Sequence, residues 1–222
     1  MFKYVVMVGS LILFLAAPLW AAKVLVGNYA SDDFDNLQVV VKNDATARIN
    51  ILEDDEAEDI FMLLADGKRW LVGRDDSESN WEAFDFEALV QFMVAMGDTM
   101  PDVSEKAVIT KSGAQTVAGI AGEGFNVKYP DETFDLVLTE NADVVLLTKI
   151  IFQFFKDIDE DDLTVLVDTV ARINADNNKN YGLLKYDGDF VFTGFERKDY
   201  PDSYFALPAG VEVLDINDMF GE

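Results

Sequence analysis

The sequence predicts an α+β protein whose main element is a mostly antiparallel β-sheet. Many short segments place apolar residues at every second position, which is the spacing of a half-buried strand. Pairs such as Asp66-Gly67 and Asp187-Gly188 separate neighbouring segments, and such pairs favour the tight turns of β-hairpins. Because a hairpin joins antiparallel neighbours, we expect a mostly antiparallel sheet. Three longer segments have the apolar content of helices.

The expected strands number roughly eight to eleven, all of them short. They lie at residues 24–26, 37–41, 45–52, 60–64, 69–72, from 108 onward, 125–129, 134–138, 181–186, 190–196 and 211–214. The first of these is either a short strand or a tail that becomes a strand on docking. Asn43-Asp44 separates the second from the third and suits a tight turn with positive φ.

The clearest hairpin lies near the middle of the chain. Phe125, Val127 and Tyr129 alternate with polar residues, and Pro130-Asp131 then starts a turn. A glycine-punctuated stretch, residues 111–124, precedes this hairpin. It lacks the lysine spacing of a phosphate-binding loop, and a strand rather than a helix follows it. We therefore expect its glycines to mark turns and bulges, at Gly113, Gly119, Gly122 and Gly124.

Three helices are expected, at residues 86–96, 143–156 and 161–174. The first has Asp85 as a good N-cap and Gly97 as a good stop. It is apolar on nearly all sides, so it must be covered on most of them. It either crosses a core or closes over an apolar ligand. The second segment is also compatible with a strand at its start, but a helix is favoured.

Residues 1–22 predict a signal peptide. Lys3 is the only charge, an apolar run covers residues 5–15, and small residues end the segment. An uncleaved membrane anchor is the alternative, but the run is short for a membrane span. The chain has no cysteine, which excludes disulfides and a lipid-modified N-terminal cysteine. We expect a soluble periplasmic protein, with residues 23–222 as a single domain.

Charge and composition exclude several functions. The chain has 42 acidic and 17 basic residues, a net charge of −25. Nucleic acid and anionic lipid headgroups are therefore not expected as partners. Such an excess is typical of a strongly solvated surface; an acidic surface for a basic partner is the alternative.

Catalytic motifs are missing from the sequence. Without histidine or cysteine there is no Ser-His-Asp triad, no thiol nucleophile and no histidine-bearing zinc site. So many carboxylates are present that no single pair indicates a glycosidase. We expect no enzyme activity and no cofactor, and an enzyme that uses carboxylates remains the third hypothesis.

One metal-like pattern requires comment. Asp157, Asp159, Asp161 and Asp168 have the spacing of calcium-loop ligands, but Asp162 stands where that loop needs glycine. An acid-rich helix N-terminus, stabilised by the helix dipole, explains the pattern better. No metal is expected.

The aromatic and methionine content suggests an apolar ligand. Two of the expected helices carry more phenylalanine and methionine than a thin cover needs, and such surfaces suit apolar ligands. The candidate cavity or lid residues are Phe86, Leu89, Phe92, Met93, Met96, Phe152 and Phe155. Ordinary core packing is the alternative for each of them.

Arg48 is the polar candidate. It lies mid-strand among small and apolar residues. It either faces solvent or forms a polar anchor at the rim of a cavity, for a ligand acid or a loop carbonyl.

Several short motifs suggest a family. They are Ala47-Arg48-Ile49, the run at residues 62–70, the run at residues 113–119 and Phe205-Ala206-Leu207-Pro208-Ala209-Gly210. Together they resemble a group of uncharacterised exported bacterial proteins whose fold is similar to the LolA/LolB lipoprotein carriers. The resemblance implies a strongly curved, incomplete antiparallel β-barrel, with about three helices over its open side and an apolar cavity beneath. It also implies acyl chains as ligands, and it puts Arg48 near a functional arginine of the carriers.

These observations lead to two hypotheses. The first is a soluble, monomeric, non-catalytic periplasmic module that binds a lipid, an acyl chain or another apolar small molecule. The second is an envelope structural or interaction protein, with an envelope protein as partner and a filled core.

Overall fold

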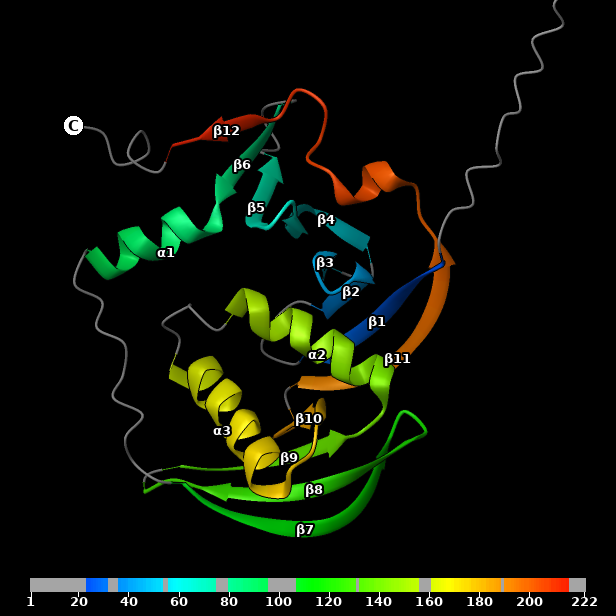
Figure 1. Ribbon diagram of the computed structural model, residues 1–222, viewed down its shortest axis with the longest axis vertical. Helices are drawn as coiled ribbons and strands as arrows, with labels where there is room; N and C mark the ends of the chain where they lie inside the picture. Colours follow the sequence, from blue (N-terminus) through cyan, green and yellow to red (C-terminus); the bar gives the residue numbers. More distant parts are fainter. Residues whose placement is uncertain are drawn as a thin grey trace, which may run out of the picture.

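A single curved sheet is the main element of the computed structural model (Figure 1). The structure describes residues 23–31, 36–53, 56–74, 80–95, 107–130, 132–155, 161–188 and 190–215. The expected signal peptide lies outside them. The strands are β1 (Lys23–Ser31), β2 (Asn36–Asn43), β3 (Thr46–Glu53), β4 (Glu56–Ala65), β5 (Lys68–Arg74), β6 (Trp81–Asp85), β7 (Val108–Val117), β8 (Ile120–Lys128), β9 (Thr133–Thr139), β10 (Gly182–Tyr186), β11 (Phe190–Asp199) and β12 (Glu212–Leu214). The helices are α1 (Phe86–Ala95), α2 (Ala142–Phe155), α3 (Asp161–Asn177) and the short 3-10 helix η1 (Asp202–Phe205).

The strand order is β12-β6-β5-β4-β3-β2-β1-β11-β10-β9-β8-β7. All neighbouring pairs are antiparallel except β12 with β6, which is parallel. The α+β class and the mostly antiparallel sheet are therefore confirmed. The sheet curves strongly around α2 and α3 but does not close, since β12 and β7 remain as its two edges.

Tight turns join most of the neighbouring strands. Asp66 and Gly67 have φ of 52° and 75° and form the two-residue turn between β4 and β5. This is the turn geometry that the sequence predicts. The Asn43-Asp44 hairpin is also present, but neither residue has positive φ, so that part of the prediction is wrong. Instead, the Asn43 side-chain Oδ1 accepts a hydrogen bond of 2.9 Å from the Ala45 amide and stabilises the turn.

The glycine-punctuated stretch forms the long β7–β8 hairpin. The register shifts between Lys111 and Gly113, and Ala118-Gly119 makes the two-residue turn, with φ of 48° and 78°. The interpretation as a bulge and a turn is confirmed at these positions. Gly122 and Gly124 lie within β8.

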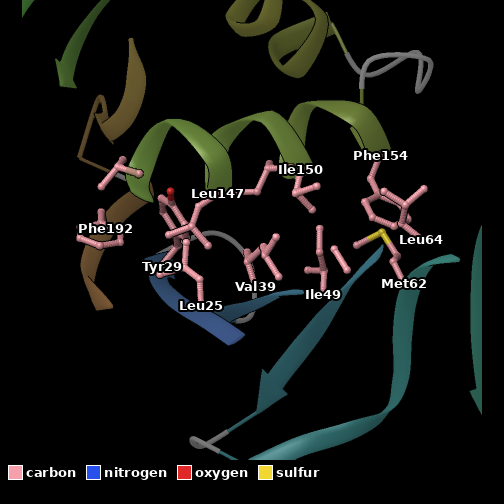
Figure 2. Packing of buried hydrophobic residues seen from close by; sticks show 14 of the residues in the cluster. Leu25, Tyr29, Val39, Ile49, Met62, Leu64, Leu147, Ile150, Phe154 and Phe192 are labelled. Carbon is pink, nitrogen blue, oxygen red and sulfur yellow. The ribbon is translucent and has the colours of Figure 1, made fainter. Parts of the chain in front are cut away.

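Helix α2 fills much of the concave face. Its buried Leu147, Ile150 and Phe154 point toward strands β1 to β4 in Figure 2, where Leu25 and Ile49 meet them. The helix begins where the Asn141 Oδ1 accepts hydrogen bonds from the amides of Asp143 and Val144, at 3.0 and 3.3 Å. An almost wholly apolar helix is stable here because sheet and hairpins cover most of its surface.

Helix α3 covers the other half of the concave face. Leu166, Val170 and Ile173 are buried against residues of β8 and β9 such as Phe125 and Phe134. Asn178, whose φ is 50°, follows the last residue of the helix, and the Lys179 amide closes the last turn by donating to the Asn174 carbonyl at 3.0 Å.

Helix α1 lies to one side of the other two helices. As predicted, Asp85 caps it, since its Oδ1 accepts a hydrogen bond of 3.1 Å from the Glu87 amide. Phe86 is buried and its ring meets that of Phe154 on α2 edge-on, with centroids 6.4 Å apart. The rest of α1 leads away from β6 in Figure 1. The open side of the sheet is thus covered mainly by α2 and α3.

The convex face is also partly covered. Residues 200–211 cross it, with Phe205 buried against Val24, Val26 and Val40. Leu207 and Val211 pack on a second cluster that includes Phe61 and Val72. Strand β12 follows and pairs with β6. The sequence predicts β12 but not β6.

Candidate ligand-binding sites

Two hollows lie on opposite faces of the sheet. We call the one between α2 and α3 the inner groove and the one beside η1 the outer pocket. The inner groove has a volume of about 340 Å³ and the outer pocket about 320 Å³.

The inner groove has mostly apolar walls from two helices and the loop that follows α3. It is lined by Val145, Thr148, Lys149, Phe152, Gln153, Val167, Val170, Ala171, Asn174, Asn180 and Tyr181. Lys149 is the only lining residue that is charged at neutral pH, and its Nζ lies 3.3 Å from the Asp44 carboxylate. The remaining polar lining residues carry amides and hydroxyls: Thr148, Gln153, Asn174, Asn180 and Tyr181.

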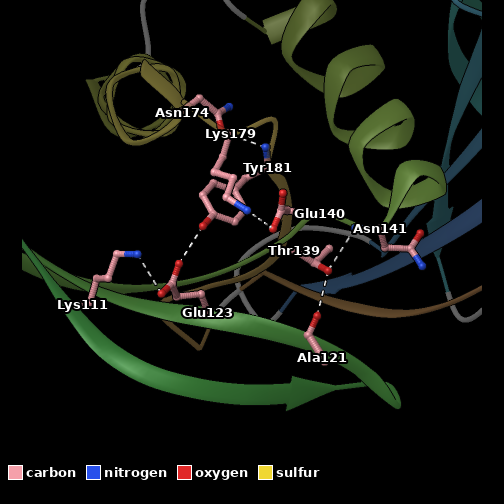
Figure 3. Close-up of polar contacts among 9 residues, drawn as sticks. All are labelled: Lys111, Ala121, Glu123, Thr139, Glu140, Asn141, Asn174, Lys179 and Tyr181. Atoms are coloured by element: carbon pink, nitrogen blue, oxygen red, sulfur yellow. Dashed lines mark hydrogen bonds and ion pairs between the residues drawn. The ribbon is translucent and has the colours of Figure 1, made fainter. Parts of the chain in front are cut away.

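Tyr181 closes one end of the inner groove, and hydrogen bonds from its hydroxyl and its amide hold it in place (Figure 3). Its hydroxyl donates to Glu123 Oε2 on β8 at 2.6 Å, and its amide donates to Asn174 Oδ1 on α3 at 2.7 Å. Burial, together with the Glu123 carboxylate, raises the pKa of Tyr181 to about 12. Lys111 and Tyr181 hydrogen-bond to Glu123 and lower the pKa of its carboxyl group.

Thr148 forms the buried link between α2 and the sheet. Its Oγ1 donates to the Val144 carbonyl at 2.9 Å and accepts from the Leu183 amide at 2.7 Å. The Thr148 hydroxyl and the Leu183 amide therefore both have hydrogen-bond partners within the protein, without a water molecule. The base of the inner groove is consequently held by hydrogen bonds that do not depend on an occupant.

Gln153 is the unsatisfied member of the lining. Its side-chain Oε1 is buried and has no hydrogen-bond partner within the described part of the chain. Its backbone carbonyl is well placed, since it accepts a hydrogen bond of 2.8 Å from Arg69 Nη1. A buried acceptor without a donor costs about 1–3 kcal/mol, so a donor brought by an occupant would be stabilising.

The outer pocket is built around Arg48 on β3. Its lining residues are Arg48, Phe61, Trp81, Pro201, Ser203, Tyr204, Ala206 and Pro208. The guanidinium carbon lies 3.4 Å from the centroid of the Phe61 ring and 4.5 Å from that of Tyr204. Arg48 Nε donates to Asn50 Oδ1 at 2.6 Å. Partial burial lowers the pKa of the guanidinium below its usual range.

The predicted site residues do not form one site. Phe152 lines the inner groove, whereas Phe86, Leu89 and Phe155 are not among its lining residues. Phe155 is half-buried and packs against the core cluster between α2 and the sheet, and Leu89 is half-buried on α1. Phe92 and Met93 belong to α1 with side chains outside the described part, and Met96 lies wholly outside it.

Arg48 is separated from the helices by the sheet itself. Its neighbours Ala47 and Ile49 belong to the core beneath α2, and alternation along the strand puts Arg48 on the opposite face. The resemblance to the carriers implies an apolar cavity beneath the helices, with Arg48 near a functional position. In this structure Arg48 does not lie on the face of the sheet that the helices cover. The sequence left two positions open for Arg48, facing solvent or bordering a cavity; the structure has it half-buried in the lining of the outer pocket.

Helix α3 contributes to the groove, which the sequence did not predict. Val167 and Ala171 are one helical turn apart and line it together with Val170. Helical spacing assigned Val167 and Val170 to a core stripe. Ala171 lies one helical turn after Val167, and this spacing was the sequence feature that could have indicated its place in the groove.

The described residues contain neither a candidate membrane-spanning helix nor a candidate metal-binding cluster. No helix there is both long and apolar enough to cross a membrane. No group of three or more acidic side chains is placed to hold a metal ion within that same part of the chain.

Comparisons with known proteins add no relative. No protein-family model matches the sequence. None of the curated proteins matches it either. The fold and the two hollows therefore define the class only as an α+β protein with a strongly curved antiparallel sheet.

Proposed function

We propose that this protein is a non-catalytic periplasmic binding module that holds a lipid or another apolar ligand in the inner groove. The periplasmic location rests on the signal-peptide pattern of residues 1–22.

The observation that carries the proposal is the inner groove itself. Its volume of about 340 Å³ is within the range of small-molecule sites, roughly 300–1,000 Å³. Its walls are largely apolar, although a protein with 42 acidic residues has ample polar side chains to cover such a surface. Each methylene that an acyl chain buries there contributes about 0.8 kcal/mol.

The polar groups around the groove favour an uncharged ligand head. Asn174 and Asn180 bring amides to the wall, and Gln153 has an acceptor without a partner among the described residues. An alcohol or an amide N–H can donate to such an acceptor, whereas a carboxylate cannot. Fatty alcohols and neutral amides are accordingly better candidates than free fatty acids.

A second candidate function is an interaction protein of the envelope. The observation that favours it is the packed core beneath α2, where Leu147 and Phe154 are fully buried against the sheet. In that case the groove would be a seam between two helices and would bind no small molecule.

A matched pair of substitutions on α3 tests the proposal. Ala171 and Ala175 are both exposed and one turn apart, but only Ala171 lines the groove. We expect Ala171→Glu to weaken binding of a fluorescent long-chain alcohol about tenfold or more, because a carboxylate would be desolvated against the ligand. Ala175→Glu adds the same charge and should leave the Kd unchanged.

Fluorescence titration of the three folded proteins provides the measurement. Equal weakening by both substitutions would indicate a charge effect rather than a site. The absence of saturable binding to the folded wild-type protein would favour the interaction protein instead.

A further inference from the structure

Arg48 is a half-buried cation without an acidic partner in the described part of the chain. It contacts Asn50, Phe61 and Tyr204, and none of these is acidic. Lys42, by contrast, has a carboxylate partner, since its Nζ lies 2.8 Å from Asp202 Oδ1. In a protein with 42 acidic and 17 basic residues, a half-buried arginine without an acidic partner is unexpected.

The surroundings of the guanidinium leave one edge for a ligand. The guanidinium carbon lies over the rings of Phe61 and Tyr204, 3.4 and 4.5 Å from their centroids, and Asn50 accepts from Nε. Asn50 is itself held, because its amide donates to Tyr204 Oη at 2.8 Å. The two Nη groups have no hydrogen-bond partner among the described residues. A guanidinium edge with two free N–H groups matches the two oxygens of a carboxylate.

The walls of the outer pocket define the rest of the ligand. Trp81, Pro201 and Pro208 supply apolar surface, and Ser203 supplies a hydroxyl group. Arg48 is the only cation in the lining. A single cation with the hydroxyls of Ser203 and Tyr204 suits a monoanion better than a doubly charged phosphate, which usually needs several donors or cations.

We propose that the outer pocket is an anion-binding site for a small organic carboxylate, with Arg48 holding the carboxylate and the aromatic and proline walls holding an apolar body. The site is independent of the inner groove, because it lies on the opposite face of the sheet. The partly buried Arg48 guanidinium then gains the counter-ion that the described residues do not provide.

The first test compares two probes on the wild-type protein, so it needs no variant to fold. 3-Phenylpropanoate and its uncharged amide, 3-phenylpropanamide, have the same apolar body. Isothermal titration should detect saturable binding of the carboxylate and at least about tenfold weaker binding of the amide, which lacks the charge. Equal binding of both, or no binding of the carboxylate, would overturn the proposal. Inorganic phosphate binding as tightly as the carboxylate would overturn the assigned ligand class.

The second test assigns the site to Arg48. Arg48→Met keeps an apolar stem beside Phe61 and should weaken carboxylate binding by about 10- to 100-fold. Arg48→Lys keeps the charge without the two-pronged edge and should give an intermediate loss. Arg197→Met removes an exposed arginine that pairs with Asp143 and should have no effect. Unchanged affinity in a folded Arg48→Met protein would contradict the assignment.

The two sites are distinguishable in the same set of proteins. Ala171→Glu should leave carboxylate binding intact, and Arg48→Lys should leave long-chain alcohol binding intact. Loss of one activity without the other would separate failure of the outer-pocket proposal from failure of the proposed function.

Discussion

Tyr181 links the local chemistry of this protein to the shape of its inner groove. It is 6 % exposed, and its hydroxyl and amide hold β8 and α3 at a common point. Nothing in the local sequence around Tyr181 indicates Glu123 as a partner of its hydroxyl, because Glu123 is far away along the chain. The polar end of the groove is therefore a product of tertiary contacts.

The raised pKa of Tyr181 leads to a pH prediction. The folded pKa of about 12 lies above the ordinary value of about 10, so the neutral phenol is the form that folding favours. Its contribution to stability is fully present below pH ~10 and is lost as the pH rises toward 12. We expect Tyr181→Phe to lower the free energy of unfolding by about 1–3 kcal/mol at pH 8.

Urea unfolding of both proteins from pH 8 to 11 measures this difference. It should shrink above pH 10, while tyrosines common to both proteins cancel. A difference that stays constant to pH 11 would show that the hydrogen bond to Glu123 does not control the ionisation.

At the scale of elements, the close contact between α2 and β10 depends on Gly182. A Cβ atom at this position would lie 2.6 Å from the Val145 nitrogen and 2.7 Å from the Val144 carbonyl carbon and oxygen. These are backbone atoms of a packed helix, so they cannot move aside as a flexible side chain can. Only glycine lets the helix lie this close to the strand.

We therefore expect Gly182→Ala to destabilise the protein by about 1–3 kcal/mol, as overpacking does in a dense core. Gly188 provides the matched control, since a Cβ there has no neighbour within 4 Å. Thermal unfolding compares the two variants. An unchanged Tm for Gly182→Ala would mean that α2 can shift away from the sheet without cost.

The elements differ in how well local sequence predicted them. The hairpin at Asp66-Gly67 and the helices α2 and α3 follow from turn chemistry and helical spacing, which are local properties. Strand β6 was missed because its residues, Trp81–Asp85, do not alternate cleanly and owe their strand geometry to pairing with β5 and β12. Residue Arg48 could be selected from sequence, but its pocket depends on a segment about 150 positions away.

At the scale of the whole molecule, charge is the dominant surface property. A net charge of −25 on 222 residues produces self-repulsion that the ion pairs of the described residues offset only locally. Salt screens such repulsion, with a Debye length that falls from about 30 Å at 0.01 M to about 3 Å at 1 M.

We expect the Tm to rise by several degrees between 10 mM and 500 mM sodium chloride, measured at constant pH by calorimetry. Potassium chloride should act similarly, because the effect is screening rather than specific sodium binding. A Tm that is flat or falls with salt would mean that favourable ion pairs outweigh the repulsion.

The α+β class, the antiparallel pairing through hairpins, the Asp85 helix cap and the acidic composition follow from the sequence alone, because each depends on residues close together in the chain or on composition. Only the three-dimensional structure shows that α2 and α3 share the concave face, that α1 lies beside them, and that Arg48 is on the other side of the sheet. These arrangements depend on contacts between distant segments, and each is set by the burial of apolar faces that many local patterns could satisfy equally well. For that reason the candidate residues could be named from the sequence, whereas the division of Phe152 and Arg48 between an inner groove and an outer pocket became visible only in three dimensions.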